Sequence, residues 1–167
     1  GTFWVTTDGS TPDGGTINAT DSDGNFSLYF EPDCTYGAGA QKWQGGVYND
    51  TCYKDKLSSN FTVNVTGQLK VEIVSPAQYQ QFNVTDTIDY RMNVTSDCSG
   101  EGAIDSSLVA IDLQAPDDSW ETCTPINNET GAGAGYYNCT WDTSGKSEGN
   151  WTVRLNASKD TFNTNST

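Results

Sequence analysis

The feature that most constrains the fold is the segment 60–66, NFTVNVT, in which polar and apolar residues alternate. In an extended chain Phe61, Val63 and Val65 lie on one face, whereas the asparagines and threonines lie on the other. The alternation therefore predicts a half-buried β-strand. Both asparagines also start an Asn-X-Thr sequon, so the pleat of the strand turns each potential glycan acceptor outward and turns X toward the core.

A second strand is expected shortly afterwards, in the segment 69–76, LKVEIVSP. Leu69, Val71 and Ile73 share the inward parity, and the proline ends the strand because it cannot donate a ladder hydrogen bond. We interpret the junction between the two strands as the boundary between two β domains.

The fold class follows from what the chain lacks as well as from these strands. No window of 11 residues shows a 3.6-residue apolar period, and strong helix formers are scarce. Five Trp, eight Tyr and six Phe among 167 residues favour strands over helices. We predict an all-β chain with two immunoglobulin-like β-sandwich domains, 9–67 and 68–167, preceded by an N-terminal donor strand, 1–8.

Further strands are expected where alternating segments are bounded by turn residues. The clearest is Thr87–Thr95, in which every second residue from Ile88 to Val94 is apolar and is expected to face inward. A hairpin is expected around the turn DSDG at 21–24. The other expected strands are Thr16–Thr20, Asn25–Phe30, 41–43, Ser107–Leu113, Ser119–Thr124, Tyr136–Trp141 and Asn150–Asn156.

Sequons are far more frequent than chance allows. Twelve of the 14 asparagines start one, whereas roughly three would do so at random given the frequency of Ser and Thr. We therefore expect a glycan coat on an extracellular or cell-surface protein. The acceptors are Asn18, Asn25, Asn49, Asn60, Asn64, Asn83, Asn93, Asn128, Asn138, Asn150, Asn156 and Asn165.

The N-terminal segment 1–7, GTFWVTT, is apolar on both faces, because Phe3 and Val5 alternate with Trp4. One interpretation is the first strand of its own sandwich. The other is a donor strand that completes the sheet of a neighbouring copy by β-augmentation, and such a head-to-tail contact generates a filament. The expected assembly strand consists of Thr2, Phe3, Trp4, Val5 and Thr6.

The five cysteines are expected to form disulfides, since the chain has no histidine and no CxxC pair to suggest a metal site. Cys34 and Cys52 bracket a Gly-rich loop and are expected to pair. Inward parity favours pairing Cys139 with Cys98, whereas symmetry about the loop at 131 favours Cys123, and both alternatives stay open. One cysteine is left over and is expected to be either free and buried or bonded between chains.

Charge and missing motifs exclude several functions. A net charge of −14 disfavours nucleic acid and anionic membrane surfaces. No apolar run is long enough for a membrane span, and a chain that begins at Gly1 without a signal peptide is expected to be a mature, exported product. The lack of histidine excludes Ser-His-Asp and Cys-His sites, so we expect no enzyme.

The string DSDGN at 21–25 resembles half a calcium loop, but a plain turn is expected there, with no metal and no cofactor other than covalent N-glycans.

Several longer segments carry a family resemblance. Residues 25–55, 65–76, 136–146 and 150–160 resemble the Ig-like repeats of heavily N-glycosylated archaeal surface proteins. They are also similar to protomers of extracellular glycofibrils in which an N-terminal strand inserts into the next subunit. Tyr137, two residues before Cys139, resembles the tyrosine corner of immunoglobulin folds. The resemblance implies that residues 3–5 form the inserted strand.

The leading hypothesis is a structural protomer of a homopolymeric extracellular filament, with possible attachment to a cell surface. The first alternative is an adhesin or carbohydrate-binding module that uses Trp43, Trp120 or Tyr36 as a sugar platform. The second alternative is one repeat of a large surface-layer protein.

Overall fold

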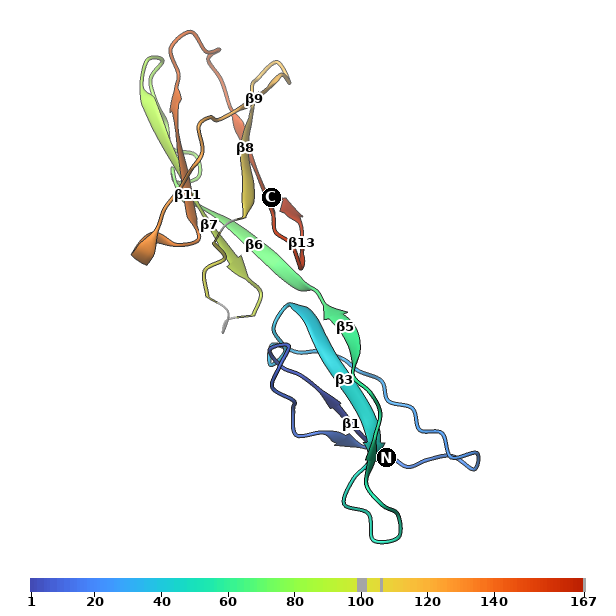
Figure 1. The fold of residues 1–167 in the computed structure, drawn as a ribbon. Coiled ribbons are helices and arrows are strands. Elements are labelled where there is room, and N and C mark those ends of the chain that lie inside the picture. Colours follow the sequence, from blue (N-terminus) through green and yellow to red (C-terminus); the bar gives the residue numbers. More distant parts are fainter. Residues whose placement is uncertain (99–101, 106, 167) are drawn as a thin grey trace. The chain divides into compact units, whose positions relative to one another are not determined.

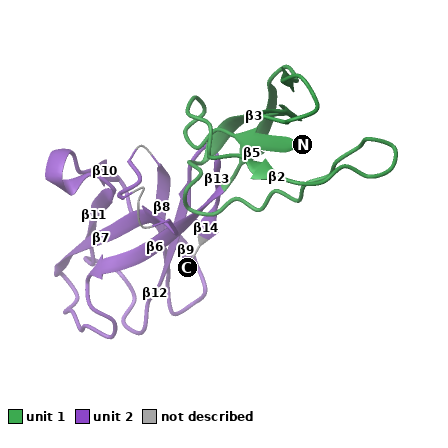
Figure 2. Ribbon diagram, turned by 90° about the horizontal axis from the view of Figure 1, so that it is seen from below, with its two compact units in different colours: residues 1–66 green, residues 67–167 purple. Residues whose placement is uncertain are grey.

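The computed structural model describes residues 1–98, 102–105 and 107–166 (Figure 1). Apart from one 3-10 turn at Gly131–Gly133, the regular elements among these residues are β-strands, which confirms the predicted all-β class. The chain divides into two compact units, residues 1–66 and residues 67–167 (Figure 2).

Unit 1 contains one antiparallel sheet built around its longest strand. Its strands are β1 (Thr2–Val5), β2 (Thr16–Ile17), β3 (Gly39–Val47), β4 (Lys56–Leu57) and β5 (Phe61–Val65). On one side of β3 lies β1, and β2 pairs with the far edge of β1. On the other side of β3, β5 pairs with its first half and β4 pairs with its last residues. The strand predicted at 60–66 is therefore present as β5.

The structure of unit 1 differs from the expected sandwich. Residues 1–66, all of them described, form one sheet, and the expected strand at 25–30 is absent from them. A Cβ added to Gly1 or Gly45 would lie 2.8 or 3.2 Å from the ring of Phe26. The ring thus packs directly on two glycines of the β1–β3 region. The alternating apolar pattern at 25–30 reflects side chains that cover the sheet rather than a strand within one.

Unit 2 is a sandwich of two sheets. One sheet has the order β10-β11-β7-β6-β13 and the other has the order β14-β12-β8-β9. All described pairings are antiparallel except that of β13 with β6. The strands are β6 (Gly67–Ser75), β7 (Thr87–Ser96), β8 (Leu108–Gln114), β9 (Trp120–Thr122), β10 (Asn127–Asn128), β11 (Tyr136–Asp142), β12 (Thr152–Ser158), β13 (Phe162–Asn163) and β14 (Asn165–Ser166).

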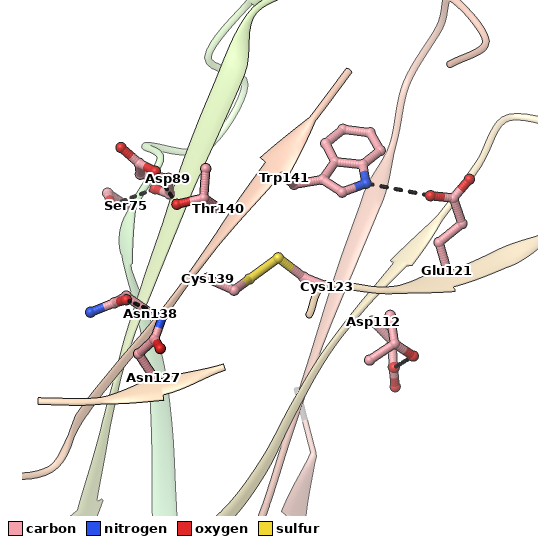
Figure 3. Close-up of a disulfide and its surroundings, with 11 residues drawn as sticks. Ser75, Asp89, Asp112, Glu121, Cys123, Asn127, Asn138, Cys139, Thr140 and Trp141 are labelled. Carbon is pink, nitrogen blue, oxygen red and sulfur yellow. Dashed lines mark hydrogen bonds between the residues drawn. A yellow bond between two sulfur atoms is a disulfide. The ribbon is translucent and has the colours of Figure 1, made fainter. Parts of the chain in front are cut away.

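The core of unit 2 lies between the two sheets. Met92 of β7 and Leu69 of β6 face Ile111 and Leu113 of β8, and all four are fully buried. The disulfide between Cys139 of β11 and Cys123, which follows β9, joins the two layers (Figure 3). Such closely packed apolar layers make sandwich formation the main source of stability in this unit.

The predicted strand parities are largely confirmed in unit 2. Every second residue of β7 from Ile88 to Ser96 is buried, and in β11 the buried residues are Tyr137, Cys139 and Trp141. In β6 only Leu69 is buried. Val71 is partly buried against the core, whereas Ile73, which was expected to face inward, is exposed.

The strand order of unit 2 corresponds to that of an immunoglobulin sandwich. The series β10-β11-β7-β6 matches strands D-E-B-A, and β14-β12-β8 matches G-F-C. The resemblance of Tyr137 to a tyrosine corner is nevertheless wrong, because Tyr137 lies on β11, the equivalent of strand E rather than F. Its hydroxyl accepts the Ser107 N–H at 2.9 Å and donates to the Ile104 carbonyl at 3.4 Å, so it ties β11 to a segment about 30 residues upstream.

Candidate functional site: the N-terminal strand and the glycan-acceptor surface

The N-terminal strand β1 lies between two other strands of its own chain. Thr2 and Phe3 pair with Ile17 and Thr16 of β2. On the other side, all four residues of β1 pair with residues 43–46 of β3. In the single chain, the expected assembly strand therefore fills a position inside the sheet of unit 1 (Figure 1).

One face of β1 packs in an aromatic row. The ring of Phe3 lies 5.1 Å from that of Trp43, and Trp43 stacks on Phe61 at 4.8 Å. Val5, on the same face, is 1% exposed. Burial of this side chain alone is worth about 1.5–3 kcal/mol relative to exposure.

The opposite face of β1 is covered as well. Trp4 meets Tyr48 edge to face at 6.0 Å. A Cβ on Gly15, which has a φ of +76°, would lie 2.5 Å from Nε1 of Trp4, so only glycine permits this close approach. The apolar character of both faces of β1 thus corresponds to cover on both faces.

The C-terminal end of β1 is fixed by a buried polar pair. Thr6 Oγ1 donates to Gln41 Oε1 at 2.9 Å and accepts the Lys42 N–H at 2.8 Å. The same Gln41 oxygen accepts the Gly9 N–H at 2.7 Å, and Gln41 Nε2 donates to the Gly37 carbonyl at 2.7 Å. Each polar atom of the Gln41 side chain is satisfied, so this buried amide costs little and fixes the register of β1 against β3.

A carboxylate holds the same end of β1 from the loop that follows it. Asp13 Oδ1 accepts the N–H groups of Val5 and Gly15 at 3.2 and 3.0 Å, and the Asp13 N–H donates to the Val5 carbonyl at 2.7 Å. The Tyr36 hydroxyl donates to Asp13 Oδ2 at 2.8 Å. This bond to a carboxylate, with burial as a second cause, raises the pKa of Tyr36 to about 12.

Sequence reasoning missed Gln41 and Asp13. The sequence did contain an indication for Gln41. It has the same strand parity as Trp43, and a polar residue at such an inward position indicates a buried, hydrogen-bonded side chain. No comparable signal existed for Asp13, which lies in a loop rich in Asp and Gly.

The structure places every sequon asparagine at the surface. Eight are exposed and four are partly buried, so each acceptor amide has some access to solvent. The exposed set is Asn18, Asn25, Asn49, Asn60, Asn64, Asn83, Asn128 and Asn150, and the partly buried set is Asn93, Asn138, Asn156 and Asn165. Thr167, the third residue of the last sequon, lies outside the described residues.

Three of the partly buried sequon asparagines already donate a hydrogen bond from Nδ2. Asn138 donates to Glu129 at 3.2 Å, Asn156 donates to Asp112 at 3.0 Å, and Asn165 donates to the Leu69 carbonyl at 2.6 Å. An amide nitrogen carries two hydrogens, so each of these side chains is oriented while one N–H stays available.

The cysteine pairing corrects one prediction and settles another. Cys52 is a free thiol, so the expected Cys34–Cys52 bridge is wrong. This leftover cysteine is exposed rather than buried as expected. Cys139 pairs with Cys123 rather than with Cys98, with the two Cα atoms 6.1 Å apart. Cys34 and Cys98 are both disulfide-bonded.

The three aromatic residues considered as a sugar platform differ in their surroundings within their own units. Both Trp43 and Tyr36 contribute to packing in unit 1, through Phe61 and through Asp13. Trp120 of unit 2 is 45% exposed, and the Arg154 guanidinium lies 4.2 Å from its ring centroid. Of the three, Trp120 alone presents substantial ring area to solvent.

The turn at 21–25 is closed by hydrogen bonds among its own residues, in which the Asp21 side chain accepts from the backbone. Asp21 Oδ1 accepts the N–H groups of Asp23 and Asn25 at 3.0 and 2.9 Å. Within the described part of the chain, no cluster of three or more His, Cys, Asp or Glu side chains is placed to hold a metal ion.

No protein-family model, curated protein or solved structure matches the chain. Among the residues that the structure describes, none belongs to a helix long and apolar enough to span a bilayer.

Proposed function

We propose that this chain is a structural protomer of an extracellular, N-glycosylated filament, in which β1 of each copy inserts into the sheet of the next copy. The observation that carries the proposal is the strand order β2-β1-β3. β1 lies between two other strands, is covered on both faces and is fixed at its end by buried polar contacts. Another copy can supply such a strand through identical contacts.

Exchange of β1 between copies preserves its contacts with β3. The aromatic contact with Trp43 and the hydrogen bond that the Thr6 hydroxyl donates to Gln41 form equally well with a β1 from a neighbour, whereas the bonds between Val5 and Asp13 are given up when the loop extends. The loop at 7–15 acts as the hinge, and nine extended residues span about 30 Å. Because the contact is head to tail, it does not close on itself and yields a filament.

The surface chemistry supports an extracellular location. The Cys123–Cys139 disulfide persists in an oxidising compartment. Tyr29 and Tyr79 are 86% and 90% exposed, and glycans on nearby acceptors would shield such side chains from non-specific association. Asn25 and Asn83 lie four residues from these two tyrosines along the chain.

Imaging of the purified glycoprotein by negative-stain electron microscopy tests the proposal. The full chain is expected to form rods of regular pitch, and a chain lacking residues 1–7 is expected to form discrete particles. A synthetic peptide of residues 1–7 should bind the truncated chain and leave it monomeric, since the peptide fills the vacant strand position but carries no further subunit.

Two results would contradict the proposal. Rods formed by the truncated chain would exclude β1 as the connecting strand, and discrete particles from the full chain would favour a single repeat or a binding module. Trp120→Ala is the matched control, because it removes an exposed aromatic ring of unit 2 and should leave the rods unchanged. Binding of the full chain to a glycan array, lost in this variant, would instead support the carbohydrate-binding alternative.

A further inference from the structure

The two arginines of the chain have the same local setting. Arg91 and Arg154 each lie two residues before a sequon asparagine, Asn93 and Asn156 respectively. Residues i and i+2 of a strand point to the same side, so each arginine and its asparagine share the outer face of a sheet. The residue between them is buried in both cases.

The first cluster lies on the outer face of β7 and β11. The Arg91 guanidinium is 4.0 Å from the Tyr136 ring centroid and forms a bidentate ion pair with Glu129 at 2.6 and 2.7 Å. Tyr136 is the cross-strand partner of Asn93. Oδ1 of Asn93 is buried without a hydrogen-bond partner, which leaves Nδ2 as the outward atom of this amide.

The second cluster lies on the outer face of the other sheet. The Arg154 guanidinium is 4.2 Å from the Trp120 ring centroid and pairs with Asp112 Oδ2 at 3.0 Å. Asn156 Nδ2 donates to the same Asp112 oxygen at 3.0 Å. The asparagine side chain is therefore held beside the arginine, with one amide hydrogen left for modification.

Both clusters present the same flat, donor-rich surface. An arginine has five N–H donors, and the bidentate pair with Glu129 uses two of those on Arg91. Stacking on an aromatic ring and pairing with a carboxylate fix the guanidinium in place, so little side-chain entropy is lost when a further acceptor binds. Exposed ion pairs contribute little to stability by themselves, so the arrangement suits recognition better than stabilisation.

We infer that each arginine–aromatic cluster is a binding site for the first sugar of the glycan on its own strand, the glycan at Asn93 in one cluster and the glycan at Asn156 in the other. The inference rests on the proposed glycan coat. In the modification, Nδ2 loses one hydrogen and bonds the anomeric carbon of a sugar phosphate donor, whose phosphate leaves while the proton passes to solvent. The sugar then lies over the arginine two residues away, about 6.6 Å along the strand. Its hydroxyl, acetamido or carboxylate oxygens accept the remaining guanidinium N–H groups.

The chain offers matched control sites. Asn64 and Asn150 are exposed sequon asparagines, but the residues two positions before them are Thr62 and Glu148. Neither asparagine therefore has an arginine two positions before it. Glycans at these two sites are expected to add solubility without a specific contribution to folding.

The test compares thermal unfolding of the full-length glycoprotein with that of variants that lose one sequon but keep its asparagine. Thr95→Ala and Ser158→Ala remove the glycans at the two arginine clusters. Thr66→Ala and Thr152→Ala remove the control glycans, at Asn64 and Asn150. The first pair should lower the unfolding midpoint of unit 2 by about 4 °C more than Thr152→Ala lowers it, and by more than Thr66→Ala lowers the midpoint of unit 1. In protein produced by a host that does not glycosylate, this difference should disappear, because only the side-chain changes remain.

A second comparison separates the effect of the arginine from the effect of the glycan. Arg91→Lys and Arg154→Lys keep the charge but lose the planar fork, and they should lower the midpoint only in the glycosylated protein. Glycopeptide mass spectrometry gives site occupancy in the same samples. If Asn93 and Asn156 are bare while other sites are modified, or if all four glycans contribute equally, the inference is overturned and the glycan coat stands. If none of the twelve asparagines is modified, the coat itself is excluded as well.

Discussion

Thr6 and Gln41 form a buried hydrogen-bonded pair at the end of β1, with 2.9 Å between Thr6 Oγ1 and Gln41 Oε1. The pair fixes how far β1 advances along β3. A filament joined by β1 needs such a stop, because a strand shifted by one residue would turn Phe3 and Val5 to the wrong face. The Gln41 amide therefore defines the register of the proposed joint.

Substitution of this amide should weaken unit 1. Gln41→Leu leaves the Gly9 N–H, the Thr6 hydroxyl and the Gly37 carbonyl without their partner, at a cost of about 2 kcal/mol in the free energy of unfolding. Urea unfolding followed by amide exchange on β3 measures the loss. Gln44→Leu is the control on the opposite face, with an expected change within about 0.5 kcal/mol. Equal effects of the two variants would show that the Gln41 bonds are not important.

The Tyr36–Asp13 bond predicts a loss of stability in strong base. The pKa of Tyr36 is about 12 in the folded chain, against 10.0 for an ordinary tyrosine. Because the folded pKa is the higher one, the stabilisation is complete below pH 10 and is lost as the pH rises toward 12. The stability advantage of the native protein over Tyr36→Phe should therefore shrink across this window in urea unfolding at several pH values. A constant difference from pH 8 to pH 12 would contradict the assignment.

The disulfide between Cys123 and Cys139 should stabilise unit 2. It closes a loop with a sequence separation of 16, which corresponds to about 3 kcal/mol in the chain-entropy treatment. The double variant Cys123→Ala/Cys139→Ala should lose about this amount in urea unfolding. Cys52→Ala is the control and should have little effect, since this thiol is free and exposed. A large effect of the control, or none of the double variant, would argue against this pairing.

The strands of unit 2 could be predicted because buried and exposed positions alternate along them in the same way as apolar and polar residues alternate in the sequence. From Ile88 to Val94 in β7 and from Tyr137 to Trp141 in β11, the inward residues are apolar or aromatic and the outward residues are polar, so residue parity gives the buried face. The same parity put the acceptor asparagines of both strands on the outer face, where the structure has them at least partly accessible.

Features that depend on a partner distant in sequence could not be predicted. The segment 25–30 alternates like a strand, yet Phe26 packs on Gly1 and Gly45, and nothing in the local pattern reveals this. Loop length suggested a Cys34–Cys52 bridge, but disulfides depend on spatial distance rather than on spacing. Both arginine clusters were also missed, because each combines three strands or loops that only the fold brings together.

The most direct test of strand exchange is a disulfide trap across the β1–β3 pair. Trp4 and Gln44 are cross-strand partners, and the Cα atoms of such pairs are about 4.5–5.5 Å apart, within reach of a disulfide. Filaments of the variant Trp4→Cys/Gln44→Cys, with Cys52→Ser to remove the free thiol, are oxidised and then denatured without reductant for gel electrophoresis. Strand exchange predicts a ladder of covalently linked chains, whereas intact filaments that yield only monomers on the gel would show that β1 stays in its own subunit.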